Sequence, residues 1–496
     1  MDKIIENTEM DLNEILRVRR EKLDTLKKEG RNPFDMTRFD REYTAKELLD
    51  NFDKFQDKEV SLAGRIMAKR IMGKASFCHI QDGLERIQLY VRVDELGEDS
   101  YSEFKKYDIG DIVGITGLTF VTHMGEKSIR VKSMVLLTKS LQPLPEKFHG
   151  LKDMDLRYRQ RYVDLIVNPE VKSVFITRAK IIKAIREYMS NLGYLEVETP
   201  VLHNQATNAN ARPFCTHQNT LDIDMYLRIE LELNLKKLIV GGLDKIFEIG
   251  KVFRNEGMDT RHNPEFTLME FYEAYGDLYT MMDRAEQIYC YVADNVLGTR
   301  QIDFQGQIIN LESPWRRLTM IEAVKEYSGV DFDSFTLDDE AAKKAAKEKN
   351  VHVESHWNWG MILNAFFEEY VEKNLIQPTF IYQYPIEISP LAKRNKDKPH
   401  LTERFEFFIL ASEMGNAFSE LNDPVDQKER LIAQAKSKFG EYEFTIDEDF
   451  INALEIGMPP TGGMGLGVER MIMLFTNSSS IRDVMFFPTM KPESNG

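Results

Sequence analysis

The chain has 496 residues, of which 42% are hydrophobic, and a formal net charge of −16 at pH 7. This composition is typical of a globular protein with several domains and excludes a disordered chain. No apolar run approaches the roughly 18 residues that span a bilayer, and we see no signal peptide, so we expect a cytoplasmic protein without a membrane partner. The chain has three cysteines, which lie far apart in the sequence, and this excludes a disulfide framework and a zinc site.

The charge is unevenly distributed. Residues 1–150 hold 26 basic and 27 acidic residues, so the remainder carries nearly all of the excess negative charge. A negative chain argues against a nucleic-acid partner, but the first part contains local basic runs such as "RVRR" at residues 17–20. Taken by itself, each of these runs is more typical of the solvated face of a helix.

The first part is predicted to contain an appendage and a small barrel. Residues 1–58 form the appendage, with a charged helix over residues 9–29. Residues 59–140 contain five short β-rich runs with glycine turns between them and a short helix near residues 101–107. This order matches a five-stranded barrel of the oligonucleotide-binding (OB) type.

Barrels of this type bind single-stranded nucleic acid by aromatic stacking and by hydrogen bonds to base edges. Phe77 and Gln88 are candidates for such contacts, with Glu126 in a later turn. The alternative for Phe77 is a position in the core of the barrel.

A larger domain is predicted to follow an ordered linker. The linker covers residues 141–160 and begins with a proline-containing stretch, and the large domain covers residues 161–496. Apolar periodicity predicts helices over residues 172–192 and 231–240. Residues 194–202 are predicted to be a strand that Pro200 interrupts, so we expect this strand to lie at an edge or an interface.

The segment "FRNEGMDTRHNPEFTLMEFYEAY" carries a high density of opposite charges. It spans the end of one apolar strand and the whole of the next, so we predict an antiparallel hairpin with a long loop. Alternation places Glu270 on the same strand face as Phe266 and Tyr272, where a carboxylate without a partner is costly. Arg254 lies at the root of the loop and can clamp a carboxylate or phosphate. A salt-bridged surface hairpin is the alternative.

The segment "ERFEFFILASEMGNAFSELND" is predicted to be a second hairpin. Asn416 and Glu420 alternate on one strand face, and folding brings Glu406 towards Glu413 at the turn. Two close carboxylates resist joint ionisation unless a cation lies between them, and oxygen ligands without cysteine suggest Mg²⁺. An exposed acidic hairpin is the alternative.

The segment "PPTGGMGLGVERMIML" contains four glycines, which allow its backbone to approach another group closely. Arg470 follows at the start of an apolar helix, which is typical of an anion site. The segment lies too near the C-terminus for a dinucleotide-binding βαβ unit, and the sequence has no P-loop. Two arginines for phosphates and the carboxylates Glu232, Glu270 and Glu420 together fit ATP and a cationic substrate, whereas aspartate or asparagine fits such an acidic pocket poorly.

These segments resemble the motifs of the class II aminoacyl-tRNA synthetases. "FRNEG", "RHNPEFT", "SELND" and "GLGVER" together are similar to the bacterial-type lysyl-tRNA synthetase family, over nearly the whole chain. The resemblance implies an α+β fold, in which an antiparallel sheet of about six or seven strands is flanked by helices and preceded by an OB-fold barrel that reads the anticodon. It also implies a homodimer, ATP as a substrate, and about two or three Mg²⁺ ions per subunit.

The resemblance assigns roles to individual residues. Arg254 and Arg470 are the catalytic residues it implies. The ATP-binding set is Arg254, Glu256, His262, Asn263, Phe266, Glu406 and Arg470. The lysine-binding set is Asn208, Glu232, Glu270, Tyr272, Asn416, Glu420 and Gly467. The anticodon-reading set is Phe77, Gln88 and Glu126, and the Mg²⁺ ligands are Glu406 and Glu413.

The implied activity is ATP-dependent activation of L-lysine and its transfer to the 3′ end of tRNA(Lys). Three alternatives remain open: a paralogue that modifies a protein, a nucleic-acid-binding protein with an inactive catalytic domain, and an aspartyl or asparaginyl enzyme. Paralogues of the first kind typically lack the barrel. The intact arginines and carboxylates argue against the second.

The sequence departs from the family pattern at the predicted lysine pocket. Thr207 and Asn208 stand where the family usually has two glycines, and Glu230 stands where a small residue is usual. Glycine permits positive φ and close backbone approach to a substrate. Either the loop keeps its path and Asn208 offers the same carbonyl, or the loop is rearranged and the pocket mouth becomes narrower or more acidic.

Overall fold

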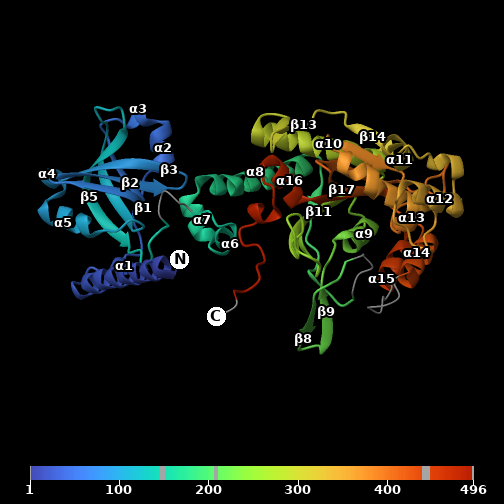
Figure 1. The fold of residues 1–496 in the computed structure, drawn as a ribbon, viewed down its shortest axis with the longest axis horizontal. Coiled ribbons are helices and arrows are strands. Elements are labelled where there is room, and N and C mark those ends of the chain that lie inside the picture. The colour runs from blue at the N-terminus through green and yellow to red at the C-terminus, as the bar shows by residue number, and fades with distance from the viewer. Residues whose placement is uncertain (1, 146–150, 206–210, 438–446, 494–496) are drawn as a thin grey trace. The chain divides into compact units, whose positions relative to one another are not determined.

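The computed structural model describes residues 2–145, 151–205, 211–437 and 447–493. The chain forms two compact units, residues 1–173 and 174–496 (Figure 1), and each is described by itself. Residues 146–150, part of the predicted linker, lie outside the described residues. The predicted domain boundaries at 58, 140 and 160 therefore stay predictions.

The first unit contains the closed five-stranded barrel that the sequence predicts. Its strands pair in the order β1-β2-β3-β5-β4. Alternate residues such as Ile80, Leu89 and Ile129 are fully buried, because successive side chains of a strand point to opposite faces. The strands are β1 (Glu59–Met72), β2 (Ala75–Asp82), β3 (Glu85–Arg92), β4 (Ile112–Val121) and β5 (Lys127–Thr138).

The predicted charged helix is the long N-terminal helix, which begins earlier than expected. Arg19 of this helix is buried and donates to the backbone carbonyls of Ile109, Ser140 and Gln142, so the helix is held against the barrel. One arginine of the "RVRR" run is thus structural. The helices of this unit are α1 (Asp2–Lys28), α2 (Ala45–Asp50), α3 (Phe52–Phe55), α4 (Val93–Leu96), α5 (Glu98–Lys106), α6 (Met154–Arg159) and α7 (Arg161–Val167).

The second unit is built on an eight-stranded sheet in the order β14-β15-β16-β17-β18-β11-β10-β6. The six inner strands are antiparallel, whereas each edge strand pairs in parallel with its neighbour. The predicted class is confirmed, but the sheet has these two additional short edges. The strands are β14 (Arg316–Thr319), β15 (Thr379–Tyr382), β16 (Arg404–Ile409), β17 (Ser412–Ser419), β18 (Thr461–Gly467), β11 (Glu265–Ala274), β10 (Lys245–Phe253) and β6 (Leu195–Glu196).

One face of this sheet carries the main hydrophobic core. Met269 and Phe271 of β11 pack there against helices α8, α10 and α16. A second cluster joins helices α9 and α15 to the other face, through residues that include Tyr272. The helices are α8 (Pro169–Asn191), α9 (Glu232–Val240), α10 (Leu278–Val292), α11 (Met320–Ser328), α12 (Asp339–Lys349), α13 (Trp359–Phe366), α14 (Pro424–Ser437), α15 (Glu448–Gly457) and α16 (Val468–Phe475).

The predicted strand over residues 194–202 is wrong for most of its length. Only Leu195–Glu196 pairs in the large sheet, and Pro200 lies in the irregular stretch that follows, because proline cannot donate to a ladder. The remaining strands are β7 (Leu202–His203), β8 (Cys215–Gln218), β9 (Ile223–Leu227), β12 (Gln301–Phe304) and β13 (Gln307–Asn310). Among the described residues, no helix is long and apolar enough to cross a bilayer.

Candidate active site

Four neighbouring strands place a row of residues on one face of the sheet. Glu270 of β11 pairs with Gly465 of β18, Gly465 with Asn416 of β17, and Asn416 with Glu406 of β16. Directly opposite residues of antiparallel strands share a face, so these side chains lie in line on the face opposite the main core. The alternation that the sequence predicts for β11 is therefore confirmed.

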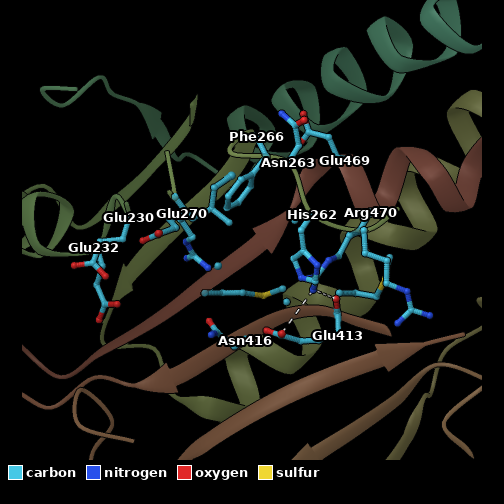
Figure 2. Close-up of a pocket in the computed structure, with 18 of the residues that line it drawn as sticks. Glu230, Glu232, His262, Asn263, Phe266, Glu270, Glu413, Asn416, Glu469 and Arg470 are labelled. Atoms are coloured by element: carbon cyan, nitrogen blue, oxygen red, sulfur yellow. Dashed lines mark hydrogen bonds and ion pairs between the residues drawn. The ribbon is translucent and has the colours of Figure 1, made fainter. Parts of the chain in front are cut away.

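A cavity of about 430 Å³ includes most of this row (Figure 2). Its walls come from β11, β17, β18, the loop between β10 and β11, and the first turns of α9 and α16. The predicted site residues that line it are Glu232, Arg254, Glu256, His262, Asn263, Phe266, Glu270, Tyr272, Glu413, Asn416, Glu420, Gly467 and Arg470. The structure thus brings the predicted nucleotide-binding and lysine-binding residues into one cavity, except Glu406, which lies outside its lining, and Asn208, which lies outside the described residues.

Glu270 finds partners within the chain. One carboxylate oxygen accepts a hydrogen bond from the backbone N–H of Leu231 (3.1 Å), and the other accepts from the hydroxyl of Tyr272 (3.0 Å). Burial raises the pKa of Glu270 to about 7, and the nearby carboxylate of Glu232 adds to the rise. Its face is fixed by strand alternation and its orientation by these two donors.

An internal cation that the sequence analysis missed lies among the acidic residues. Lys236 of α9 is fully buried, with Nζ 2.5 Å from Glu232 and 2.5 Å from Glu420. The expectation that these two carboxylates are free for a cationic substrate was therefore incomplete. The spacing of Glu232 and Lys236, four residues apart on one helix, was the signal that could have found half of this network.

The charges in this network shift one another's titration. Burial raises the pKa of Glu420 to about 8, although Lys236 opposes the rise. Burial lowers the pKa of Lys236, but Glu232 and Glu420 outweigh it and hold the pKa above its usual value. Glu420 Oε1 has no hydrogen-bond partner in the described part of the chain, so one buried acceptor faces the cavity region without a donor.

The glycines of β18 make room for these side chains, as the sequence predicts. A Cβ atom on Gly463 would lie 2.0 Å from Glu420 Oε1 and 2.4 Å from the ring of Tyr272. Both distances are far below van der Waals contact. At Gly465 the nearest atom, Asn416 Oδ1, would be 3.4 Å away, so that position is less restrictive.

Two arginines and an aromatic ring of the predicted ATP-binding set line the cavity. The guanidinium of Arg254 lies 5.3 Å from the ring centroid of Phe266, and its Nε donates to the carbonyl of Ile229 at 3.3 Å. The guanidinium of Arg470 donates to the backbone carbonyl of Glu413 and lies 3.6 Å from its carboxylate. In Figure 2, Arg470 and Glu413 lie at the opposite end from Glu230, Glu232 and Glu270.

The loop between β10 and β11 is closed by its own hydrogen bonds. The backbone N–H of Arg254 donates to the carbonyl of Pro264, and the Asn263 amide donates to the carbonyl of Glu265 at 2.7 Å. His262 Nδ1 lies 2.9 Å from Asp259, and this contact lowers the pKa of Asp259 to about 2. These bonds hold the predicted ATP-binding residues of the loop over the cavity.

The two predicted Mg²⁺ ligands lie near each other but differ in surroundings. Glu413 lines the cavity, whereas Glu406 lies outside the lining, accepts from the Tyr384 hydroxyl at 2.9 Å and pairs with Arg404. Burial raises the pKa of Glu406 to about 7; Arg404 lowers it, and the charge of Glu413 raises it. In the described part of the chain no three His, Cys, Asp or Glu side chains converge as metal ligands, so a cation would need further ligands from phosphates or water.

In the barrel, Phe77 is not a core residue. It lies half-buried on β2, on the face opposite Cys78, and its ring stacks on Tyr90 with centroids 5.0 Å apart. Gln88 donates to the hydroxyl of Ser128 at 2.9 Å. An outward aromatic and an amide on adjacent strands are compatible with base binding.

Three further residues that face outward from the barrel, Tyr90, Phe120 and Arg130, were not predicted from the sequence. Tyr90 packs against Phe120 with ring centroids 5.9 Å apart, and the guanidinium of Arg130 lies 5.1 Å from the Phe120 centroid. Glu126 lies exposed in the turn between β4 and β5. The alternation of β3 already places Tyr90 on the same face as Gln88, and this pattern could have identified it.

Asn208 and Thr207 lie outside the described residues. Their part in the pocket therefore stays a prediction.

Comparison with known proteins identifies the family. Residues 153–491 match the model described as "tRNA synthetases class II (D, K and N)", and residues 60–137 match "OB-fold nucleic acid binding domain". The chain is 58% identical over its whole length to a lysine–tRNA ligase of Thermoanaerobacter sp. (strain X514), covering 99% of that protein. It is 54% identical to the lysine–tRNA ligase of Clostridium tetani, and the match covers 100% of the chain and 99% of that relative. It is also 54% identical to the lysine–tRNA ligase of Moorella thermoacetica, and this match covers 97% of the chain and 98% of the relative. The chain therefore belongs to the class II tRNA synthetases, among the lysine–tRNA ligases.

Proposed function

We infer that this chain activates L-lysine with ATP and transfers the lysyl group to the 3′ end of tRNA(Lys). The observation that carries the choice of amino acid is the acidic end of the cavity, with the carboxylates of Glu230, Glu232, Glu270 and Glu420. Lys236 is the internal cation that pairs with two of them. The negative charge that Lys236 does not neutralise suits a substrate with two ammonium groups.

The family also includes enzymes for aspartate and asparagine, which are the nearest rivals. An aspartate side chain placed among these carboxylates would bring like charges together in a buried site. Asparagine would supply its α-ammonium group but no second ammonium group, so part of the acidic end would lack a counter-charge. The composition of the cavity therefore favours lysine over both.

The reaction needs positioning and charge neutralisation more than a protein nucleophile. The lysine carboxylate attacks the α-phosphate of ATP in line, and pyrophosphate leaves. We propose that Arg254 holds the carboxylate and the α-phosphate, while Phe266 and Arg470 enclose the adenine. The terminal ribose hydroxyl of the tRNA then takes the lysyl group from the adenylate.

The same proposal assigns Mg²⁺ to Glu406 and Glu413. Two carboxylates with phosphate and water ligands fit this cation, and the effect of Glu413 on the titration of Glu406 supports their closeness. Bound Mg²⁺ would neutralise charge on the phosphates of ATP. How many ions bind per subunit stays a prediction, as do the homodimer and the cytoplasmic location.

We assign anticodon recognition to the barrel. The half-buried, outward-facing stack of Phe77 and Tyr90 supports base stacking. Gln88 lies on the strand next to Phe77, and Glu126 lies in the turn before β5.

The test is ATP–pyrophosphate exchange by the full chain with lysine, aspartate and asparagine at equal concentrations. We expect exchange with lysine to exceed exchange with either rival by at least about 100-fold, which corresponds to about 2.7 kcal/mol. Glu340→Gln, which removes one exposed charge that is not part of the cavity lining, is the control for net charge. Faster exchange with aspartate or asparagine would overturn the proposal.

A further inference from the structure

Glu230 is a cavity residue to which the family resemblance gives no role. It lines the acidic end, and 9% of its surface is exposed. Among the described residues, no hydrogen bond or ion pair involves its carboxylate. Glu270, by contrast, has two donors within the chain, and Glu232 and Glu420 share Lys236.

The backbone on either side fixes where Glu230 lies. The preceding carbonyl, that of Ile229, accepts from Arg254 Nε at 3.3 Å, and the following N–H, that of Leu231, donates to Glu270 at 3.1 Å. Glu230 therefore lies between the arginine proposed to hold the substrate carboxylate and the buried carboxylate of β11. Figure 2 places it beside Glu232 and Glu270.

The surroundings of Glu230 disfavour its ionised carboxylate unless a cation binds nearby. Burial raises its pKa to about 8, Glu232 and Glu270 add to the rise, and Arg254 and Lys236 oppose it. Lys236 is already paired, and Arg254 would be engaged by the substrate carboxylate and the phosphate. A buried carboxylate in this position is stabilised by a bound ammonium group.

We propose that Glu230 is a specificity-determining residue that, together with Glu232, binds the α-ammonium group of the amino acid. The α-ammonium is one carbon from the carboxylate held by Arg254, so it lies on the side of the cavity where Glu230 is found. The second ammonium reaches further, towards Glu420 and Tyr272. This inference rests on the proposed function, because it takes lysine as the substrate.

Two probes that each lack one ammonium group test the assignment. 6-Aminohexanoate lacks the α-ammonium, and L-norleucine lacks the ε-ammonium. Glu230→Gln keeps the size of the side chain and removes its charge. We expect the lysine KM in ATP–pyrophosphate exchange and the inhibition constant of norleucine to rise about tenfold, the loss typical of one charge-assisted hydrogen bond. The inhibition constant of 6-aminohexanoate and the KM for ATP should change less than about twofold.

The controls separate this inference from the proposed function. Exchange by the unaltered chain reports on the proposed function alone, and Glu340→Gln reports on net charge. If the unaltered chain shows no exchange with lysine, the proposed function fails, and calorimetric binding of the two probes still tests Glu230. If Glu230→Gln does not fold, Glu230→Asp, which withdraws the carboxylate by one methylene, gives the same comparison.

Two results would overturn the inference. An unchanged lysine KM would mean that Glu230 does not contact the substrate. Equal losses for norleucine and 6-aminohexanoate would mean that Glu230 acts on the whole pocket and not on the α-ammonium.

Discussion

At the scale of single residues, the acidic end of the cavity is a balance between buried carboxylates and Lys236. Strand alternation was enough to predict the direction of Glu270, because that pattern is local. The contact between Lys236 and Glu420 could not be predicted in the same way, because it joins α9 to the end of β17 across the fold. Pattern analysis therefore identified the carboxylates without the cation that balances them.

Replacing Lys236 with methionine should destabilise the substrate-free protein in a pH-dependent way. Removing one partner of a buried ion pair costs about 3–5 kcal/mol, since Glu232 and Glu420 then lose their counter-charge. Lys236 opposes the rise in the pKa of Glu420, which burial brings to about 8. Without Lys236 that pKa would rise further, so the variant loses additional stability as the pH rises through about 8. Urea unfolding should show a loss that is about 1 kcal/mol larger at pH 9 than at pH 6. Equal losses at both pH values would contradict the charge balance.

Replacing Gly463 with alanine should weaken lysine binding more than ATP binding. The added Cβ would displace Glu420 and Tyr272, which it would approach to 2.0 and 2.4 Å. Gly465→Ala is the matched comparison, because its Cβ would have ordinary contacts of 3.4 Å or more. We expect the lysine KM to rise at least about tenfold more in Gly463→Ala than in Gly465→Ala. Similar lysine KM values for the two variants would count against this role of the glycine.

At the scale of elements, the barrel and the large sheet carry separate parts of the proposed reaction. The sequence predicted the five barrel strands from their β-rich runs and the glycine turns between them, and the hairpin of β10 and β11 from the period-two alternation of β11. It overestimated the strand at 194–202, where pairing depends on a distant partner, β10. Edge strands of two residues carry too little local pattern to be predicted.

Phe77→Ala, in the first unit, should impair tRNA charging, whereas Arg254→Ala, in the second unit, should impair lysine activation. Loss of Phe77 removes stacking worth about 1–3 kcal/mol per base, so kcat/KM for tRNA charging should fall about 10- to 100-fold while lysine-dependent exchange is retained. Arg254→Ala should abolish exchange itself. Phe34→Ala, at an exposed aromatic of the first unit, is the control. If Phe77→Ala reduced exchange as much as charging, the division between the units would be wrong.

At the scale of the whole molecule, the negative net charge and the nucleic-acid partner are compatible because the charge is segregated. Residues 1–150 are nearly neutral, with 26 basic and 27 acidic residues, whereas the acidic cavity belongs to the second unit. A net charge taken over the full chain therefore gave the wrong indication about a nucleic-acid partner. The OB-fold match over residues 60–137 agrees with the local pattern instead.

The most direct test of the account is aminoacylation by the full chain of a tRNA(Lys) transcript with a U-rich anticodon. The same transcript with an exchanged anticodon is the control for the barrel, and aspartate is the control for the cavity. We predict that lysine is attached to the first transcript, that the exchanged anticodon lowers kcat/KM by about 10-fold or more, and that aspartate is not attached. Attachment of aspartate, or no attachment of lysine to either transcript, would contradict the account.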